Sequence, residues 1–258
     1  MFEPRVALAS LSGDANAEWA ATGAPFAGAA FLGGIALCEQ TQTAARALRA
    51  RGRSEFLPSD PFAFIDAQFG ALSDVPIRPG INVRATDPMA ISRAVKVCRE
   101  HDAILEINAH CRQAEMCTAG AGESLLTDLN RLGRLVEAGS TLPALTVKVR
   151  AEVPSVDLVE VAETVQTAGA TGIHIDAMDT EHVIQEVVDA TDLFVIANNG
   201  VRDEATVAEY ANYGADAVSV GRPSDRPAVL ARVNAAVDRH LPAIDRRQVI
   251  RGYPGNDK

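Results

Sequence analysis

Eight short runs of β-branched or apolar residues recur along this chain, and helical segments separate most of them. The runs cover residues 5–9, 28–32, 81–83, 103–107, 145–149, 172–175, 193–197 and 217–220. Strands that alternate with helices at this spacing predict parallel βαβ units. Eight such strands favour an α/β fold closed as a (β/α)8 TIM barrel, with an open doubly wound sheet as the alternative.

The segments between the runs carry apolar residues at helical spacing. The pattern predicts helices over residues 41–51, 89–101, 125–138, 157–168, 204–213 and 228–240. Asp203 is placed to cap one helix at its start, and Gly169 and Gly214 are placed to end two others just before a strand.

The length of 258 residues, 47% of them hydrophobic, suits one barrel with little left over. We expect a single barrel domain over residues 1–240 and a C-terminal tail over 241–258. An insertion of about residues 38–78 separates strands 2 and 3 and holds four phenylalanines. Such an insertion lies either over the active-site face or against a helix, and the sequence leaves both open.

Composition indicates where the protein works. No run approaches about 18 apolar residues and the N-terminus has no basic leader, so we expect a cytoplasmic protein without a membrane partner. Four cysteines without a CxxC pair suit a reducing compartment. The net charge is −10, which tells against a nucleic-acid complex held by charge alone, although salt would screen the same field.

Polar residues follow nearly every predicted strand. In a barrel, the carboxyl ends of the strands converge on the ligand, so these positions predict the active site. They are Ser10, Gly33, Asn82, Asn108, Cys111, Lys148, Arg150, His174, Asp176, Asn198, Asn199, Gly221 and Arg222.

Lys148 is the most informative of these residues because the chain holds only three lysines among 24 basic residues. Alternation in its strand puts Lys148 and Arg150 on the inner face. A buried ammonium is costly unless an anion or an electron-rich ligand meets it. The alternative is a structural ion pair with Glu106 or Asp176.

Cys111 follows strand 4 between His110 and Arg112. A thiol there suits a nucleophile, an acid or a metal ligand, and a buried inert cysteine is the alternative. Cys111, Cys117 and His110 match no zinc spacing, so we expect no metal.

The last two strand ends predict a phosphate cradle. Glycines at 200 and 221 let the backbone approach a ligand closely, and Arg222 supplies a bidentate cation. Barrels often hold a phosphate between these two loops. The pattern does not say which phosphate-bearing ligand is bound.

Taken together and in order, several motifs resemble those of the dihydrouridine synthase family of flavin-dependent barrels, especially its divergent archaeal relatives. Residues 8–14 (LASLSGD) resemble that family's LAPMxGxTD, and residues 82–88 (NVRATDP) resemble QxxGxDP. Residues 107–112 (INAHCR) resemble INxGCP, and residues 119–126 (AGAGESLL) resemble GGAGxxLL. Residues 146–150 (TVKVR) resemble TVKIR, residues 173–174 (IH) resemble the start of IHGR, and the Asn-Asn-Gly and Gly-Arg elements complete the match.

The resemblance implies an FMN cofactor and assigns roles to the residues. Its phosphate would rest on Asn198, Asn199, Gly200, Gly221 and Arg222. Lys148 and His174 would lie against the isoalloxazine, with Ser10 and Asn82 also at the cofactor. Cys111 would protonate C5 of a uracil ring while reduced flavin passes a hydride to C6, and Asn108, Arg150 and Asp176 would face the substrate.

The family's usual substrate is uridine in tRNA, and NAD(P)H or another reductant would be a transient electron donor. The chain departs from the pattern at Ser10 and Leu11, where the family has Pro and Met, and at Asn82, where it has Gln. It also departs at His110, Arg112 and Asp176, where the family has Gly, Pro and Arg. After strand 8 there is room for one helix and a short tail, so we do not expect the family's helical tRNA-gripping domain. Two other functions stay open: a flavin-free isomerase, lyase or synthase acting on a phosphorylated metabolite, or a non-catalytic barrel subunit.

Overall fold

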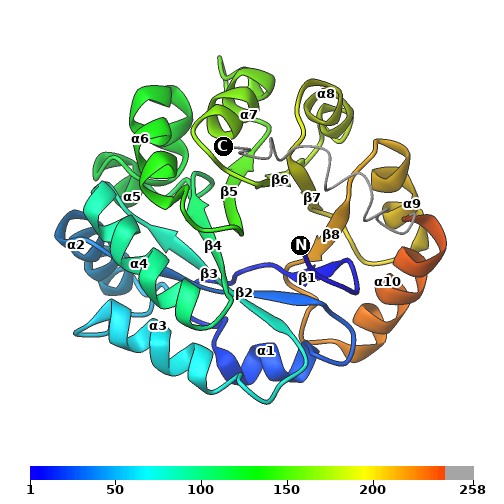
Figure 1. Ribbon diagram of the computed structural model, residues 1–258, viewed down its shortest axis with the longest axis horizontal. Coiled ribbons are helices and arrows are strands. Elements are labelled where there is room, and N and C mark those ends of the chain that lie inside the picture. Colours follow the sequence, from blue (N-terminus) through cyan, green and yellow to red (C-terminus); the bar gives the residue numbers. More distant parts are fainter. Residues whose placement is uncertain (242–258) are drawn as a thin grey trace, which may run out of the picture.

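The computed structural model describes residues 1–241 and shows eight parallel strands closed into a barrel (Figure 1). Each strand pairs with the next, and β8 closes on β1. The predicted single-domain (β/α)8 barrel is therefore confirmed. The strands are β1 (Val6–Leu8), β2 (Ala29–Ala36), β3 (Arg78–Arg84), β4 (Ile104–Asn108), β5 (Leu145–Arg150), β6 (Gly172–Asp176), β7 (Phe194–Asn198) and β8 (Ala217–Val220).

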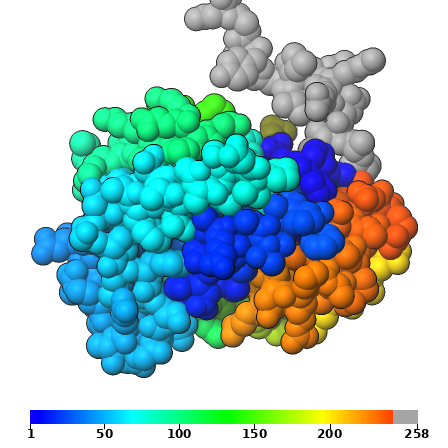
Figure 2. All heavy atoms as spheres, turned by 90° about the horizontal axis from the view of Figure 1, so that it is seen from below, coloured from blue at the N-terminus to red at the C-terminus, as the bar shows by residue number. Residues whose placement is uncertain are grey.

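Helices form a continuous outer layer around the strands. In the side view of Figure 2, dark-blue α1 lies in the middle. The light-blue and cyan segments that follow it in the sequence lie on one side of it, and orange α10 lies on the other. The helices are α1 (Ala17–Gly23), α2 (Glu39–Ala50), α3 (Pro61–Gly70), α4 (Pro88–Glu100), α5 (Ala114–Thr118), α6 (Leu129–Gly139), α7 (Leu158–Thr167), α8 (Val183–Ala190), α9 (Glu204–Asn212) and α10 (Pro227–His240). None of these described helices combines the length and apolar character needed to cross a membrane.

Local capping explains where several helices begin and end. The Asp203 side chain accepts from the backbone N–H of Thr206 at the start of α9, as predicted. Gly169 and Gly214 have φ of +104° and +85° just after α7 and α9, which is the left-handed conformation that ends a helix. The helix predicted over residues 125–138 is instead two, because Asp128 ends the 3-10 helix η1 (Gly122–Thr127) and caps α6.

Strand β2 is longer than the sequence predicted. It continues through Gly33 to Ala36, and its register with β3 shifts between Gly33 and Ile35. Gly33 therefore lies inside the strand at a bulge and not at the strand end where we expected it. The glycine pair was read as a stop because glycine interrupts most strands, whereas here pairing with β3 resumes beyond it.

The insertion between β2 and β3 has two parts with different roles. Helix α3 packs against α4 and completes the outer layer. Helix α2 contacts α5, which follows the carboxyl end of β4. Between them, Glu55 reaches Arg84 at the end of β3, with 2.6 Å between Oε2 and Nη1. Both predicted placements of the insertion thus hold in part.

The barrel interior changes character along its axis. Its amino-terminal half is filled by Ala7, Ala29, Phe31, Ile104 and Ile196, and Phe2 packs against this cluster. Its carboxyl-terminal half is polar, and the fully buried side chains there include Asn82, Glu106, His174 and Ser219. The predicted tail lies outside the described residues, apart from Leu241. The polar half of the interior therefore points to the carboxyl ends of the strands as the functional end.

Candidate active site

Lys148 lies on the inner face of β5, level with Asn108 on β4 and His174 on β6. Its side chain is buried, yet within the described residues its ammonium makes no hydrogen bond and no ion pair within 4.0 Å. The structural ion pair with Glu106 or Asp176 that we had considered is absent at that distance. Burial lowers the pKa of Lys148, and the charges of Glu106 and Asp176 offset only part of this effect.

A line of buried hydrogen bonds crosses the interior beside Lys148. His174 lies 2.7 Å from the Ser219 hydroxyl through Nε2 and 2.6 Å from Glu106 through Nδ1. The Asn82 amide donates to Glu106 over 2.7 Å, and the Asn108 amide donates to Asn82 over 2.8 Å. The line therefore links β8, β6, β4 and β3, and it leaves none of these side chains without a partner.

The charges on this line can be assigned. Burial lowers the pKa of His174 to about 4, so its ring is neutral at neutral pH. A carboxylate only accepts, so Nδ1 carries the hydrogen and Nε2 accepts from Ser219. Burial opposes ionisation of Glu106, but its interactions with His174, Lys148 and Asn82 outweigh this and lower its pKa. Glu106 is thus a buried anion, and its negative charge interacts favourably with the ammonium of Lys148.

Three predicted site residues belong to this line and do not line the open mouth. Asn82 and His174 are completely buried with their polar groups occupied. The side-chain oxygen of Asn108, Oδ1, accepts from the backbone N–H groups of His110 and Cys111, at 3.1 and 2.9 Å. The sequence identified these residues by their position at the strand ends, but their partners inside the barrel could not be read from it. In the structure Asn82 and His174 hold Glu106, and Asn108 holds the loop after β4.

His110 and Cys111 point to different surroundings in the extended segment after β4. The His110 ring reaches β6, where its Nε2 lies 2.6 Å from Asp176 Oδ2. Cys111 instead packs against a cluster under α2 that includes Ala36, Ala44 and Met116. The structure therefore brings His110 to the mouth of the barrel, whereas the sequence had favoured the neighbouring thiol.

Asp176 is held from two sides. Its Oδ2 meets His110, and its Oδ1 accepts from the Asn199 amide over 2.7 Å. Burial opposes its charge, but these two hydrogen bonds, together with the charges of His110 and Lys148, outweigh burial and lower its pKa, so Asp176 is ionised. Burial lowers the pKa of His110, with Lys148 and Arg150 adding to this effect and Asp176 opposing it.

Arg150 is less available to bind a substrate than the sequence suggested. Its guanidinium pairs with Glu152 and lies 3.7 Å from a carboxylate oxygen of Glu123. With its charge met by two carboxylates, Arg150 supports the loops above β5. A direct role in binding an anionic substrate would require this arrangement to open.

The two loops of the predicted phosphate cradle, after β7 and β8, are open. Asn199 and Gly200 have φ of +97° and +64°, and the Tyr210 hydroxyl donates to the carbonyls of Asn198 and Asn199. A Cβ added at Gly200 or Gly221 would meet nothing within 4 Å. Among the described residues, no acceptor is found for the backbone N–H groups of Gly200 or Arg222.

These observations fit a phosphorylated cofactor. Open space lies beside two loops in which the N–H groups of Gly200 and Arg222 find no acceptor among residues 1–241, and the Arg222 side chain is exposed. Lys148 is a buried cation with no carboxylate of these residues within 4.0 Å. Ser10, just past β1, is half-buried and makes no hydrogen bond within the described part of the chain. The residues present could therefore hold FMN, with its phosphate at the last two strand ends.

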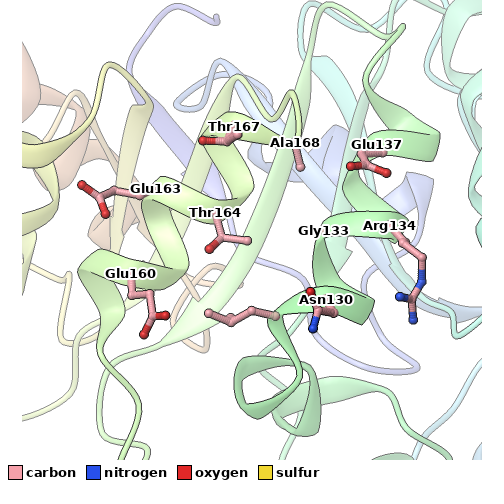
Figure 3. Close-up of a pocket in the computed structure, with 10 residues that line it drawn as sticks. Asn130, Gly133, Arg134, Glu137, Glu160, Glu163, Thr164, Thr167 and Ala168 are labelled. Carbon is pink, nitrogen blue, oxygen red and sulfur yellow. The ribbon is translucent and has the colours of Figure 1, made fainter.

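A separate groove lies on the outside of the barrel between α6 and α7 (Figure 3). Its walls include Glu137, Glu160 and Glu163, which project from the two helices. The groove lies on the helical layer and not at the strand ends, and its carboxylates disfavour a phosphate. It is not the site described above.

A buried cation and two glycine loops at the carboxyl end of a parallel barrel define a class of barrel protein with a site for a phosphorylated ligand. The sequence pattern of the family described as Dihydrouridine synthase (Dus) matches residues 80–250, so the chain belongs to the dihydrouridine synthase family. The match begins in β3 and includes Asn82, Lys148 and both cradle loops. Membership in this family supports an enzyme of the flavin-dependent oxidoreductase type.

The chain is also similar to two other proteins. An uncharacterized protein of Methanocaldococcus jannaschii is 25% identical over 234 residues, which is 86% of this chain and 89% of that protein. A mutant of FabK from Thermotoga maritima superposes with a TM-score of 0.56 at 17% identity. That similarity covers 86% of this chain but only 63% of FabK, and it supports the fold alone.

Proposed function

We propose that this protein is an FMN-dependent reductase that acts on the C5=C6 bond of a uracil-type ring. The observation that carries the proposal is Lys148 at the carboxyl end of β5, a buried ammonium with no carboxylate of the described residues within 4.0 Å. A cation beside the N1–O2 edge of a flavin stabilises its reduced, anionic form. Family membership makes a flavin the preferred candidate for this position.

The residues of the mouth divide the work of binding. Gly200 and Arg222 offer backbone N–H groups to the phosphate, and the Arg222 guanidinium adds charge. Lys148 meets the electron-rich ring, and the negative charge of Glu106 favours the protonated form of Lys148. Bound FMN supplies the hydride for the reduction.

The substrate class comes from the family. Uridine in tRNA is the first candidate, which would make the enzyme one of tRNA processing, and NAD(P)H or another reductant would reload the flavin. Cys111 stays the residue assigned to protonation by resemblance, although its side chain packs under α2. The net charge of −10 implies that a tRNA would be held by local contacts and not by the overall field.

Lys148 also favours a second candidate. An amine whose pKa is lowered by burial is suited to form a Schiff base with a carbonyl substrate. A flavin-free enzyme acting on a phosphorylated carbonyl compound would use the same cradle. Reductive trapping with borohydride, followed by mass spectrometry of the peptide that contains Lys148, would reveal such an adduct.

The deciding experiment is to incubate the purified protein with FMN, desalt it and record the visible spectrum. We expect flavin bands at roughly one FMN per chain. Substitution of Lys148 by Met and of Arg222 by Ala should each weaken retention, whereas Arg99→Ala, at the amino-terminal end of the barrel, should not. A colourless protein would contradict the proposal and favour the phosphorylated-metabolite alternative.

The substrate is tested on the loaded protein. After anaerobic reduction, unmodified tRNA transcript or uridine monophosphate is added and flavin reoxidation is followed. Mass spectrometry of the nucleosides should show dihydrouridine. Reoxidation by the tRNA alone would indicate that the polynucleotide is recognised.

A further inference from the structure

Two of the positions where the chain departs from its family pattern contact each other. His110 stands where the family has glycine and Asp176 where it has arginine, and their side chains meet at 2.6 Å across the mouth of the barrel. A glycine cannot make this contact and an arginine would not anchor an imidazole in this way. The two departures are therefore one coupled feature of the site.

The geometry of this pair leaves one reactive atom free. His110 uses Nε2 to bind Asp176, and its Nδ1 makes no hydrogen bond within the described residues. The His110 side chain is 29% exposed, so a ligand in the mouth can reach it. Asn199 fixes Asp176 from the other side, which ties the pair to the cradle loop after β7.

The neighbouring thiol is directed elsewhere. Consecutive residues in an extended segment present their side chains to opposite sides. With His110 turned into the mouth, Cys111 packs against the apolar cluster under α2. The side-chain oxygen of Asn108 accepts from the backbone N–H groups of both His110 and Cys111, so the loop is fixed in this orientation.

We propose that His110, oriented by Asp176, is the general acid that protonates the substrate carbon in this protein. The inference rests on the proposed reduction of a C=C bond. The proton leaves Nδ1 of the imidazolium and forms a C–H bond at one alkene carbon. Reduced FMN, when bound, would supply the hydride that forms the C–H bond at the other carbon as the π bond breaks. FMN would thereby be oxidised and the alkene reduced, and neutral His110 would regain a proton from solvent.

The charges around His110 set the direction of its pH dependence. Asp176 on β6 favours the imidazolium, whereas Lys148 and Arg150 on β5 and burial disfavour it. Turnover should therefore fall as the pH rises through the pKa of His110. Asp176 is a positioning residue, and Asp176→Asn removes the favourable charge, so the falling limb of the pH profile should move to lower pH.

The main test compares oxidative half-reactions of the FMN-loaded, reduced protein with unmodified tRNA transcript or uridine monophosphate. His110→Gln should slow flavin reoxidation by about 10²- to 10⁴-fold, as expected for loss of a general acid. FMN retention and reduction by dithionite should be unchanged. His101→Gln is the matched control because His101 and Asp66 form a similar pair, 2.8 Å apart, at the amino-terminal end of the barrel.

Cys111→Ser separates the two candidate acids. A large loss in Cys111→Ser together with near-normal reoxidation in His110→Gln would overturn the proposal while leaving the reductase function intact. Loss of reoxidation in the unsubstituted protein with both probes would count against the proposed function instead.

A second readout needs no turnover. In ¹⁵N-histidine-labelled protein, the signal missing from His110→Gln identifies the ring. Above the pKa of His110 the neutral ring should carry its proton on Nε2 and leave Nδ1 free, and the Nδ1 resonance should shift when FMN and uridine monophosphate are added. A neutral ring that carries its proton on Nδ1 and not on Nε2, or a resonance that does not respond to either ligand, would overturn the assignment of His110.

Discussion

His174 Nδ1 lies 2.6 Å from Glu106 Oε2, and neither side chain has any exposed surface. The pKa of His174 falls to about 4 in the folded protein because burial disfavours its charge. In the unfolded chain a histidine titrates near about 6.5. Between these two pKa values His174 is therefore neutral in the folded protein and protonated in the unfolded chain.

This difference predicts a loss of stability in acid. Between about pH 6.5 and pH 4 the unfolded chain binds one more proton at this site, so the free energy of unfolding falls as the pH falls. The full loss is about 3 kcal/mol. Chemical denaturation at pH 7.5 and pH 4.5 would measure it. His174→Gln should flatten this part of the profile, and an unchanged slope in that variant would mean that other groups cause it.

Lys148→Met should separate stability from binding. Removing an ammonium that has no partner relieves a desolvation cost, so the midpoint of thermal unfolding should rise by an amount equivalent to about 1–2 kcal/mol. FMN retention should fall in the same variant. Calorimetry and the desalting experiment report the two effects, and a less stable Lys148→Met would show that the ammonium has a structural partner.

The Arg84–Glu55 pair fixes the insertion to the end of β3. Both side chains are nearly inaccessible, at 3% and 1% exposed, so substituting one leaves the other as a buried, unpaired charge. Glu55→Gln or Arg84→Met should each lower the free energy of unfolding by about 3–5 kcal/mol. The double substitution should cost clearly less than the sum of the two. Additive losses in denaturant titrations would mean that the pair is not coupled.

Alanine substitutions at Gly13 and Gly52 separate the cost of a steric clash with a neighbouring segment from the cost of a positive φ angle. Both have positive φ, +77° and +82°, but a Cβ at Gly13 would lie 2.5 Å from backbone and side-chain carbons of Ser54 whereas one at Gly52 meets nothing within 4 Å. Gly52→Ala should cost about 1 kcal/mol through φ alone. Gly13→Ala should cost clearly more, and equal losses in both variants would argue that the insertion shifts freely.

Much of the fold could be predicted because strand and helix periodicities differ and the helices carry their own caps. Asp203, Gly169 and Gly214 gave correct helix boundaries from local chemistry alone. The extension of β2 beyond Gly33 could not be predicted, because pairing with β3 across a bulge decides it. Helix α3 was also missed, since the sequence marked only a region rich in phenylalanine and proline.

The site was predicted less completely than the fold. Alternation put Lys148 and Arg150 on the inner face, and strand-end position identified Asn82 and His174. Neither signal could distinguish the mouth of the barrel from the interior below it. The contact between His110 and Asp176 joins residues 66 positions apart and is visible only in three dimensions. The signal in the sequence was that both positions depart from the family pattern at once.

The buried line from Ser219 to Asn108 has a consequence for folding itself. Each of its members must face inward, and a shift of one residue in any contributing strand would turn that member to the outer face. The partners left behind would then lack hydrogen bonds in a place that water does not reach, at a cost of about 1–3 kcal/mol for each group. Barrels of similar length that differ only in strand alignment are thereby excluded. The same polar groups that prepare the mouth for a ligand also select which of the alternative barrels the chain can adopt.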